Sequence, residues 1–169
     1  MARILMIIPP EKFRDDELFI SKTEFEKEGH SITIASIKKG IISGSKGGEI
    51  NSEAIIDDVK IADYDGVVFI GGEGSKLLFN NPSAIKIAKQ TYEQNKIISA
   101  ICLAPVILAN AGVLKGKKAT VFGTELKTIE SKGAIYAGRG VAVDGNVVTG
   151  NAPKSAALFA QKINELLKR

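Results

Sequence analysis

The sequence predicts an α/β fold in which a mostly parallel β-sheet is covered by helices on both faces. Strand-like apolar runs alternate with helix-like segments along the chain, which is typical of repeated strand–helix units. The runs at 3–8, 66–72 and 97–101 lack a polar face, as strands buried on both sides do. No repeat, low-complexity stretch or linker interrupts this pattern. Residues 1–169 are therefore predicted to form one domain.

The chain begins with a predicted strand, helix and second strand. Residues 3–8 form an apolar run. Residues 14–29 repeat apolar side chains at a spacing of about 3.6 residues until Gly29 ends the helix. Residues 30–36 alternate between apolar and polar side chains, which indicates a strand. The glycine-rich residues 39–50 predict a small β-excursion with tight turns.

The central part of the chain predicts two further strand–helix units. Residues 50–65 are polar and predict only a short helical turn. The apolar strand 66–72 ends in two glycines, and the helix 80–96 starts at an Asn-Pro signal. The strand 97–101 is followed by a predicted helix over 103–114.

The last third of the chain predicts short strands between two helices. Residues 118–123 read as a strand, and residues 124–133 as a helix with a threonine cap and a terminal glycine. The segment 134–150 holds strands around Asp144-Gly145, a strong hairpin signal. Residues 152–169 close the chain as an amphipathic helix.

The composition excludes several classes of function. Hydrophobic residues make up 44% and charged residues 25%, as in ordinary globular proteins. No run reaches the roughly 20 apolar residues of a membrane span, and the net charge of +4 is scattered, so neither a membrane nor a nucleic acid is an expected partner. One cysteine and one histidine allow no internal disulfide, Cys-based zinc site or multi-His site. We therefore expect no metal or cofactor, and a cytoplasmic location for the free thiol.

Cys102, the only cysteine, lies at the junction of the predicted strand 97–101 and the predicted helix 103–114. Ligand sites in open α/β sheets form beyond the carboxyl ends of strands, and a residue at a sharp strand-to-helix turn projects its side chain there. The unpaired N–H groups and the dipole of a helix start favour the thiolate, which is the nucleophile. A buried cysteine that merely fills core space is the alternative. The position at the junction favours a nucleophile.

Two other predicted strand ends carry groups that can assist a nucleophile. Gly71 and Gly72 end a strand, where glycine lets backbone N–H groups face a ligand as in an oxyanion hole; a plain tight turn is the alternative. A cluster of four acids follows the first strand, and most of its members are expected to be solvated or to stabilise a helix start. One of them can instead turn toward the thiol. The cluster comprises Glu11, Asp15, Asp16 and Glu17.

Taken together, these motifs resemble the ThiJ/PfpI superfamily, which includes the PfpI-type intracellular proteases and the parkinsonism-associated protein deglycase. The resemblance covers nearly the whole chain, with its most specific motifs in "DYDGVVFIGG" (63–72) and "ISAICLAPVILANAGVLKGKKAT" (98–120). It implies a flavodoxin-like three-layer sandwich with a mostly parallel sheet, like that of class I glutamine amidotransferases. It also implies a homodimer or a higher homo-oligomer.

The resemblance assigns roles to individual residues. The family nucleophile corresponds to Cys102, and its acidic partner corresponds to Glu17. The backbone that holds the oxyanion and the substrate corresponds to Gly71, Gly72 and Leu103.

Histidine is missing from the places where the family carries it. PfpI-type proteases have histidine directly after the cysteine, where this chain has Leu103, and other members have one in the segment that corresponds to 119–125. The only histidine, His30, is expected in a water-exposed turn at the opposite end of the sheet. No Cys–His pair is therefore expected within a subunit, which disfavours an intracellular cysteine peptidase.

Three functions remain open from the residues and the resemblance. The first is a glyoxalase- or deglycase-like enzyme for small aldehydes or glycated groups. Cys102 would be its nucleophile, and a protonated Glu17 would be its acid/base and would lower the pKa of the thiol. The second is a non-enzymatic stress-response protein whose Cys102 senses oxidants. The third is the peptidase already disfavoured.

Overall fold

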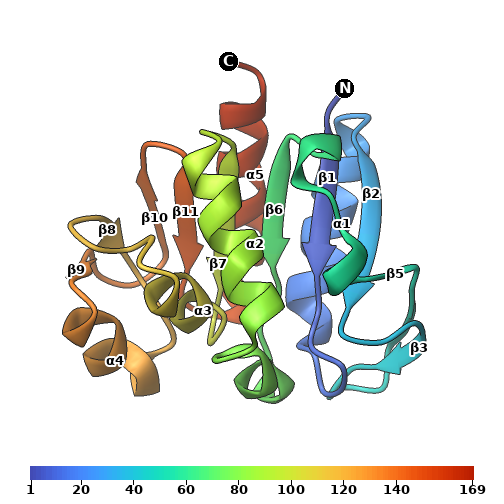
Figure 1. Cartoon of the computed structure of the whole chain (residues 1–169), viewed down its shortest axis with the longest axis horizontal. Coiled ribbons are helices and arrows are strands. Elements are labelled where there is room, and N and C mark those ends of the chain that lie inside the picture. Colours follow the sequence, from blue (N-terminus) through green and yellow to red (C-terminus); the bar gives the residue numbers. More distant parts are fainter.

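The computed structural model describes residues 1–169 and contains the predicted sandwich of a parallel sheet between helices (Figure 1). The central sheet has seven strands in the order β10-β11-β7-β6-β1-β2-β5. All neighbouring strands run parallel except β10 (Val141–Asp144) and β11 (Val147–Gly150), which form the hairpin predicted around Asp144-Gly145. No helix of the structure has both the length and the apolar character to cross a bilayer.

The order of the strands reverses in the middle of the sheet. From β1 (Arg3–Ile7) the chain continues to β2 (Ser31–Ser36) and β5 (Ala54–Ile55) on one side. It then returns to β6 (Gly66–Phe69) and β7 (Ile97–Ile101) on the other side of β1. Such a switch point is where ligands bind in open α/β sheets, beyond the carboxyl ends of the strands.

Helices cover both faces of the sheet (Figure 1). Side chains of β1 alternate between the two resulting cores: Leu5 and Ile7 pack with one set of helices, and Ile4 and Met6 with the other. One face is covered by α2 (Pro82–Glu93), α3 (Pro105–Asn110) and α4 (Leu126–Ser131), and the other by α1 (Asp15–Lys27) and α5 (Ala156–Leu167).

The polar segment before β6 contains more structure than its sequence predicts. The predicted β-excursion is an antiparallel pair of β3 (Gly40–Ser43) and β4 (Glu49–Ser52). Two 3₁₀ turns, η1 (Ile56–Asp58) and η2 (Ile61–Asp63), follow the edge strand β5. β5 was not predicted because two residues are too few to produce a periodic pattern.

The segment after α3 differs most from its prediction. The expected strand 118–123 is reduced to β8 (Lys118–Ala119), which pairs with β9 (Ile135–Tyr136) outside the main sheet. The chain leaves the strand because the Phe122 N–H donates to the Cys102 carbonyl over 2.8 Å. The expected threonine cap is also wrong, since α4 begins after a 3₁₀ turn, η4 (Gly123–Glu125), without a side-chain cap.

Candidate active site

Loops from three adjacent strands meet at the carboxyl end of the sheet. The Arg14 N–H, in the loop after β1, donates to the Gly71 carbonyl after β6 over 3.0 Å. The Gly71 N–H donates to Glu17 Oε1 over 2.9 Å. A Cβ atom on Gly71 would lie 2.9 Å from the Cβ of Cys102, after β7. The structure therefore places Glu17, Gly71 and Cys102 in direct contact.

Cys102 is held in a backbone conformation that non-glycine residues rarely adopt. Its φ is 64°, in the left-handed region. Its N–H donates to the Gly150 carbonyl over 2.9 Å, and its carbonyl accepts from Phe122. Such strain costs roughly 1–3 kcal/mol and persists only where the surroundings impose it. α3 begins at Pro105 rather than at the expected 103, so Leu103 lies in the turn itself.

Glu17 is a fully buried acid in the first turn of α1. Its side chain is 0% exposed, and Oε2 has no hydrogen-bond partner. Burial raises the pKa of Glu17 to about 8, against the opposing effects of the adjacent Cys102 side chain and of the hydrogen bond from the Gly71 amide. A helix start favours a carboxylate by only about 1 kcal/mol, so desolvation outweighs it here. Glu17 therefore holds a proton at neutral pH.

The pKa of the Cys102 thiol is shifted in the direction opposite to the one predicted from the sequence. Burial raises its pKa above the usual value, and a charge on Glu17 raises it further, whereas the Leu103 amide and Arg14 act in the opposite direction. The predicted lowering was wrong because the sequence did not reveal the desolvation. The charge of Glu17 disappears when Glu17 is protonated. The thiolate is therefore favoured only while Glu17 is neutral and can donate to the sulfur.

The three predicted backbone donors divide into two groups. The Gly71 N–H is already bound to Glu17, so this residue holds the acid. Neither the Gly72 N–H nor the Leu103 N–H has a backbone acceptor. Gly72 has a φ of 113°, and a Cβ there would lie 2.5 Å from both Arg14 N and Lys12 O, so only glycine fits.

The other acids of the cluster serve the fold or face solvent. Asp15 is buried; its Oδ1 accepts the Lys46 N–H over 2.8 Å and its Oδ2 accepts the Gly48 N–H over 2.7 Å. Asp15 thus anchors the β3–β4 hairpin to α1. Glu11 and Asp16 are exposed. Of the four acids, Glu17 is the one that lies beside the thiol.

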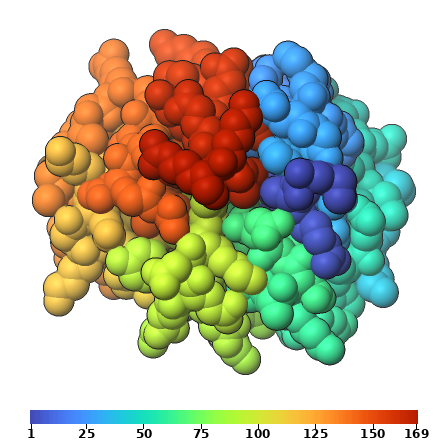
Figure 2. Space-filling model, turned by 90° about the horizontal axis from the view of Figure 1, so that it is seen from above, coloured from blue at the N-terminus to red at the C-terminus, as the bar shows by residue number.

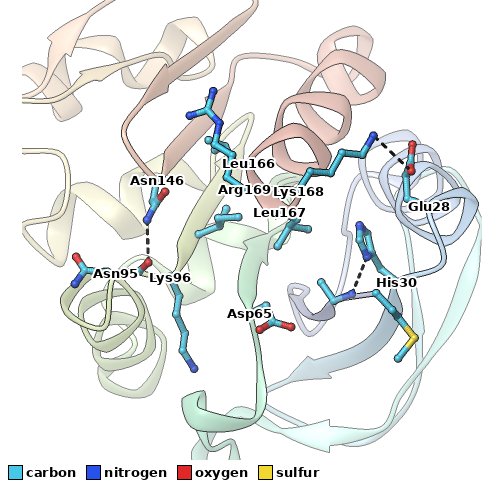
Figure 3. Close-up of a pocket in the computed structure, with 13 residues that line it drawn as sticks. Glu28, His30, Asp65, Asn95, Lys96, Asn146, Leu166, Leu167, Lys168 and Arg169 are labelled. Carbon is cyan, nitrogen blue, oxygen red and sulfur yellow. Dashed lines mark hydrogen bonds and ion pairs between the residues drawn. The ribbon is translucent and has the colours of Figure 1, made fainter.

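His30 lies at the opposite end of the sheet, beside an open cleft of about 720 Å³ (Figure 3). Figure 2 views the molecule from this end, where the red C-terminal residues lie near the dark blue N-terminal ones. Asp65, Lys96 and Asn146 also line this cleft, between the first residues and the end of α5. His30 is half-buried and its Nδ1 accepts the Ala2 N–H over 2.9 Å, so the expected water-exposed turn is only partly correct. No three His, Cys, Asp or Glu side chains come together as metal ligands.

Arg14 is a residue of this end of the sheet that the sequence did not single out. It precedes α1, its backbone contacts Gly71, and its charge lowers the pKa of both Glu17 and Cys102. The available signal is an arginine directly before three consecutive acids, Asp15 to Glu17. That signal alone did not distinguish it from a solvated charge.

This fold and this site define an α/β protein that carries a strained cysteine at a strand-to-helix turn, paired with a buried acid. The chain belongs to the DJ-1/PfpI family, whose model matches residues 2–166. It is 44% identical to an uncharacterised protein of Methanocaldococcus jannaschii, over 99% of this chain and 83% of that protein. It is 31% identical to the deglycase PfpI of Pyrococcus furiosus, over 97% of this chain and 99% of that one. A ThiJ/PfpI domain protein from Brachyspira murdochii superposes with a TM-score of 0.96 at 31% identity, covering 98% and 96% of the two chains.

Proposed function

We propose that this protein converts small 2-oxoaldehydes, or their early adducts on glycated groups, by a cysteine-dependent reaction of the glyoxalase or deglycase type. The observation that carries the proposal is the contact between a buried acid with a pKa of about 8 and a strained cysteine. A group with that pKa both gives and takes a proton near neutrality. The name of the P. furiosus relative fits the same substrate class.

The proposed reaction begins with addition of the Cys102 sulfur to the aldehyde carbon of methylglyoxal. Cys102 reacts as the thiolate beside a protonated Glu17, which gives its proton to the aldehyde oxygen, so that a hemithioacetal forms and Glu17 becomes a carboxylate. The N–H of Gly72, which has no backbone acceptor, and the N–H of Leu103, which acts on the Cys102 sulfur, would receive the oxygen as its charge develops. These two donors would lower the barrier to addition.

Glu17 then moves a second proton. Its carboxylate takes the proton from the former aldehyde carbon and returns it to the neighbouring carbon, while the hydroxyl proton moves to the neighbouring oxygen. The product is a lactoyl thioester on Cys102. Water hydrolyses this thioester to lactate and the free thiol, so methylglyoxal and one water give lactic acid. One acid serves both transfers because it lies beside the sulfur.

The two alternative functions fit these observations less well. A peptidase needs a proton donor for the leaving amine, and the only histidine lies at the other end of the sheet. Cys102 is 7% exposed, which suits a small aldehyde better than a polypeptide. Peroxide-sensing cysteines are accessible and have a low pKa, whereas burial raises the pKa of this thiol.

The test is formation of lactate from methylglyoxal by the wild-type protein, Cys102→Ser and Glu17→Gln. We expect Cys102→Ser to abolish turnover, and Glu17→Gln to lower kcat about 10²- to 10⁴-fold, which is the usual contribution of a general acid–base group. His30→Gln is the matched control, since it removes the one other side chain whose pKa is shifted and lies at the opposite end of the sheet.

Three results would decide against the proposal. Lactate formation that persists in Cys102→Ser would remove the nucleophile. No turnover by the wild-type protein, together with ready sulfinate formation on peroxide, would favour the redox sensor. Casein cleavage that is lost in Cys102→Ser would favour the peptidase. The homo-oligomer implied by the resemblance and the cytoplasmic location remain predictions.

A further inference from the structure

Arg14 lies at the edge of the proposed reaction centre. Its backbone N–H donates to the Gly71 carbonyl. A Cβ atom on Gly72 would lie 2.5 Å from the same backbone nitrogen. Both glycines belong to the loop that carries the proposed oxyanion donor. The Arg14 charge also lowers the pKa of Cys102 and of Glu17, as a cation close to both groups does.

The guanidinium group of Arg14 has no acceptor within the protein. Its Nε is buried without a hydrogen-bond partner. Its one charged neighbour is the exposed Asp16, whose Oδ2 lies 3.8 Å from Nη2, too far for a hydrogen bond. The Arg14 side chain is 33% exposed, so part of it is withdrawn from water. A partly buried arginine normally has its forked donors matched by an anion.

A second polar group beside Cys102 also lacks a partner. Glu17 is 0% exposed, and its Oε2 makes no hydrogen bond. Two unpartnered polar groups, one just before α1 and one in its first turn, lie next to a strained cysteine and indicate that a bound molecule completes the site. That molecule would meet the neutral acid near its reacting carbon and the cation at a neighbouring position.

We propose that Arg14 determines substrate specificity by binding an oxyanion, so that the site prefers 2-oxoaldehydes or adducts carrying a carboxylate or phosphate near the carbonyl. This inference rests on the proposed function and names its substrate class. Arginine suits the role because its planar fork pairs with carboxylate and phosphate through two hydrogen bonds, which lysine does not reproduce.

The test compares alkylation of Cys102 by iodoacetate, which is anionic, and by iodoacetamide, which is neutral. The rate ratio of the two reagents, divided by the same ratio for glutathione, isolates attraction of an anion to the site. We expect Arg14→Gln to lower this ratio about tenfold, as loss of a charge-assisted hydrogen bond does, and Arg14→Lys to lower it less. The ratio cancels a general change in thiol reactivity, and circular dichroism checks that each variant is folded.

Lys22→Gln is the matched control, because it removes one positive charge from the same helix and its side chain is 30% exposed. An equal fall of the ratio in Lys22→Gln would assign the effect to the general field and overturn the proposal. An unchanged ratio in Arg14→Gln would do the same. Alkylation needs no turnover, so these outcomes stay separate from failure of the glyoxalase reaction.

Protection experiments distinguish the two kinds of anion. Inorganic phosphate or acetate is added during alkylation of the wild-type protein by iodoacetamide. Protection by phosphate that is lost in Arg14→Gln assigns a phosphate group, and the same result with acetate assigns a carboxylate. Protection by neither anion contradicts the proposal. Where turnover is observed, hydroxypyruvaldehyde phosphate should show a lower KM than methylglyoxal, and Arg14→Gln should raise that KM selectively.

Discussion

The two ends of the central sheet differ in two respects: how much open volume they contain, and how many strained or unpartnered buried groups they gather. The amino end holds an open cleft of about 720 Å³, and most of the polar side chains named there are engaged, with His30 Nε2 as the exception (Figure 3). Lys96 Nζ donates to the Ile61 carbonyl over 2.7 Å, and Asn146 Nδ2 donates to the Asn95 carbonyl over 2.8 Å.

The carboxyl end is nearly closed, since Cys102 is 7% exposed, yet it gathers a strained cysteine, a neutral buried acid and an unpartnered arginine. A cleft forms wherever helix and strand ends fail to fill space, at no special energetic cost. Strain and unpaired buried groups cost free energy in the folded state. They therefore mark the carboxyl end as the site of chemistry more strongly than volume marks the amino end.

The largest expected effect comes from the pH dependence of Glu17. Its pKa is raised to about 8 in the folded protein, so its neutral form is favoured there and stability falls as pH rises from the ordinary value of 4.5 through 8. Relative to Glu17→Gln, the wild-type protein should lose up to roughly 5 kcal/mol of unfolding free energy between pH 4 and pH 9. Urea denaturation across this range measures the difference.

The exposed Glu26, on the same helix, provides the control for Glu17. Glu26→Gln should leave the pH profile of stability close to that of the wild-type protein. If the profiles of the wild-type protein and of Glu17→Gln run parallel, Glu17 is solvated in solution and the contrast between the two ends loses its main support.

A pair of glycine substitutions compares crowding at the two ends. A Cβ on Gly71 would lie 2.6 Å from the Ile101 carbonyl oxygen and 2.7 Å from Glu17 Oε1, whereas a Cβ on Gly29 would meet nothing within 4 Å. Gly71→Ala should destabilise by about 3 kcal/mol through overpacking and should abolish reaction of Cys102. Gly29→Ala should cost only about 1 kcal/mol, because its φ of 81° is strained for alanine. Equal losses on chemical denaturation would show that the carboxyl end is not tightly packed.

The difference between the two ends was only partly predictable from the sequence. The junction at Cys102 followed from the apolar run 97–101 and from Pro105, and the glycine pair from its place after β6, because local patterns determine where strands stop. The inward turn of one acid was predicted as a possibility, and its identity as Glu17 came from the family resemblance.

What the sequence did not reveal depends on burial and on contacts between distant segments. The predicted direction of the Cys102 pKa shift was wrong. Local motifs favour the thiolate, whereas burial of the sulfur in the folded chain raises its pKa. Arg14 was missed because its lack of a partner exists only once the chain is folded. The strand 118–123 failed for a similar reason, since Phe122 bonds to Cys102 in place of a strand neighbour.

Two aspartates test how firmly each end anchors its loops. Asp15 is buried and accepts two backbone N–H groups, whereas the exposed Asp65 accepts one, from Arg3 over 2.8 Å. In Asp15→Asn one oxygen becomes an NH₂ group that faces a donor, so we expect a loss of about 2 kcal/mol. Asp65→Asn keeps an acceptor and should cost about 0.5 kcal/mol. Thermal denaturation measures the two losses. A lower melting temperature for Asp15→Asn than for Asp65→Asn, with faster proteolysis of the β3–β4 hairpin in Asp15→Asn alone, would support this difference. Equal melting temperatures would contradict it.

The smallest effect is expected from His30, and its smallness is the informative result. Burial lowers the pKa of His30, so its neutral form is favoured in the folded protein and its contribution to stability is lost as pH falls below 6.5. The ring is partly exposed, so solvent screening limits this effect. Below pH 6.5, the unfolding free energies of the wild-type protein and of His30→Gln should change with pH by amounts that differ by less than about 1 kcal/mol. Alkylation of Cys102 by iodoacetamide should keep its wild-type rate and pH profile, because the sheet separates the two groups. A shifted profile in His30→Gln would mean that the amino end acts on the thiol, and the carboxyl end could then no longer be treated as a self-contained reaction centre.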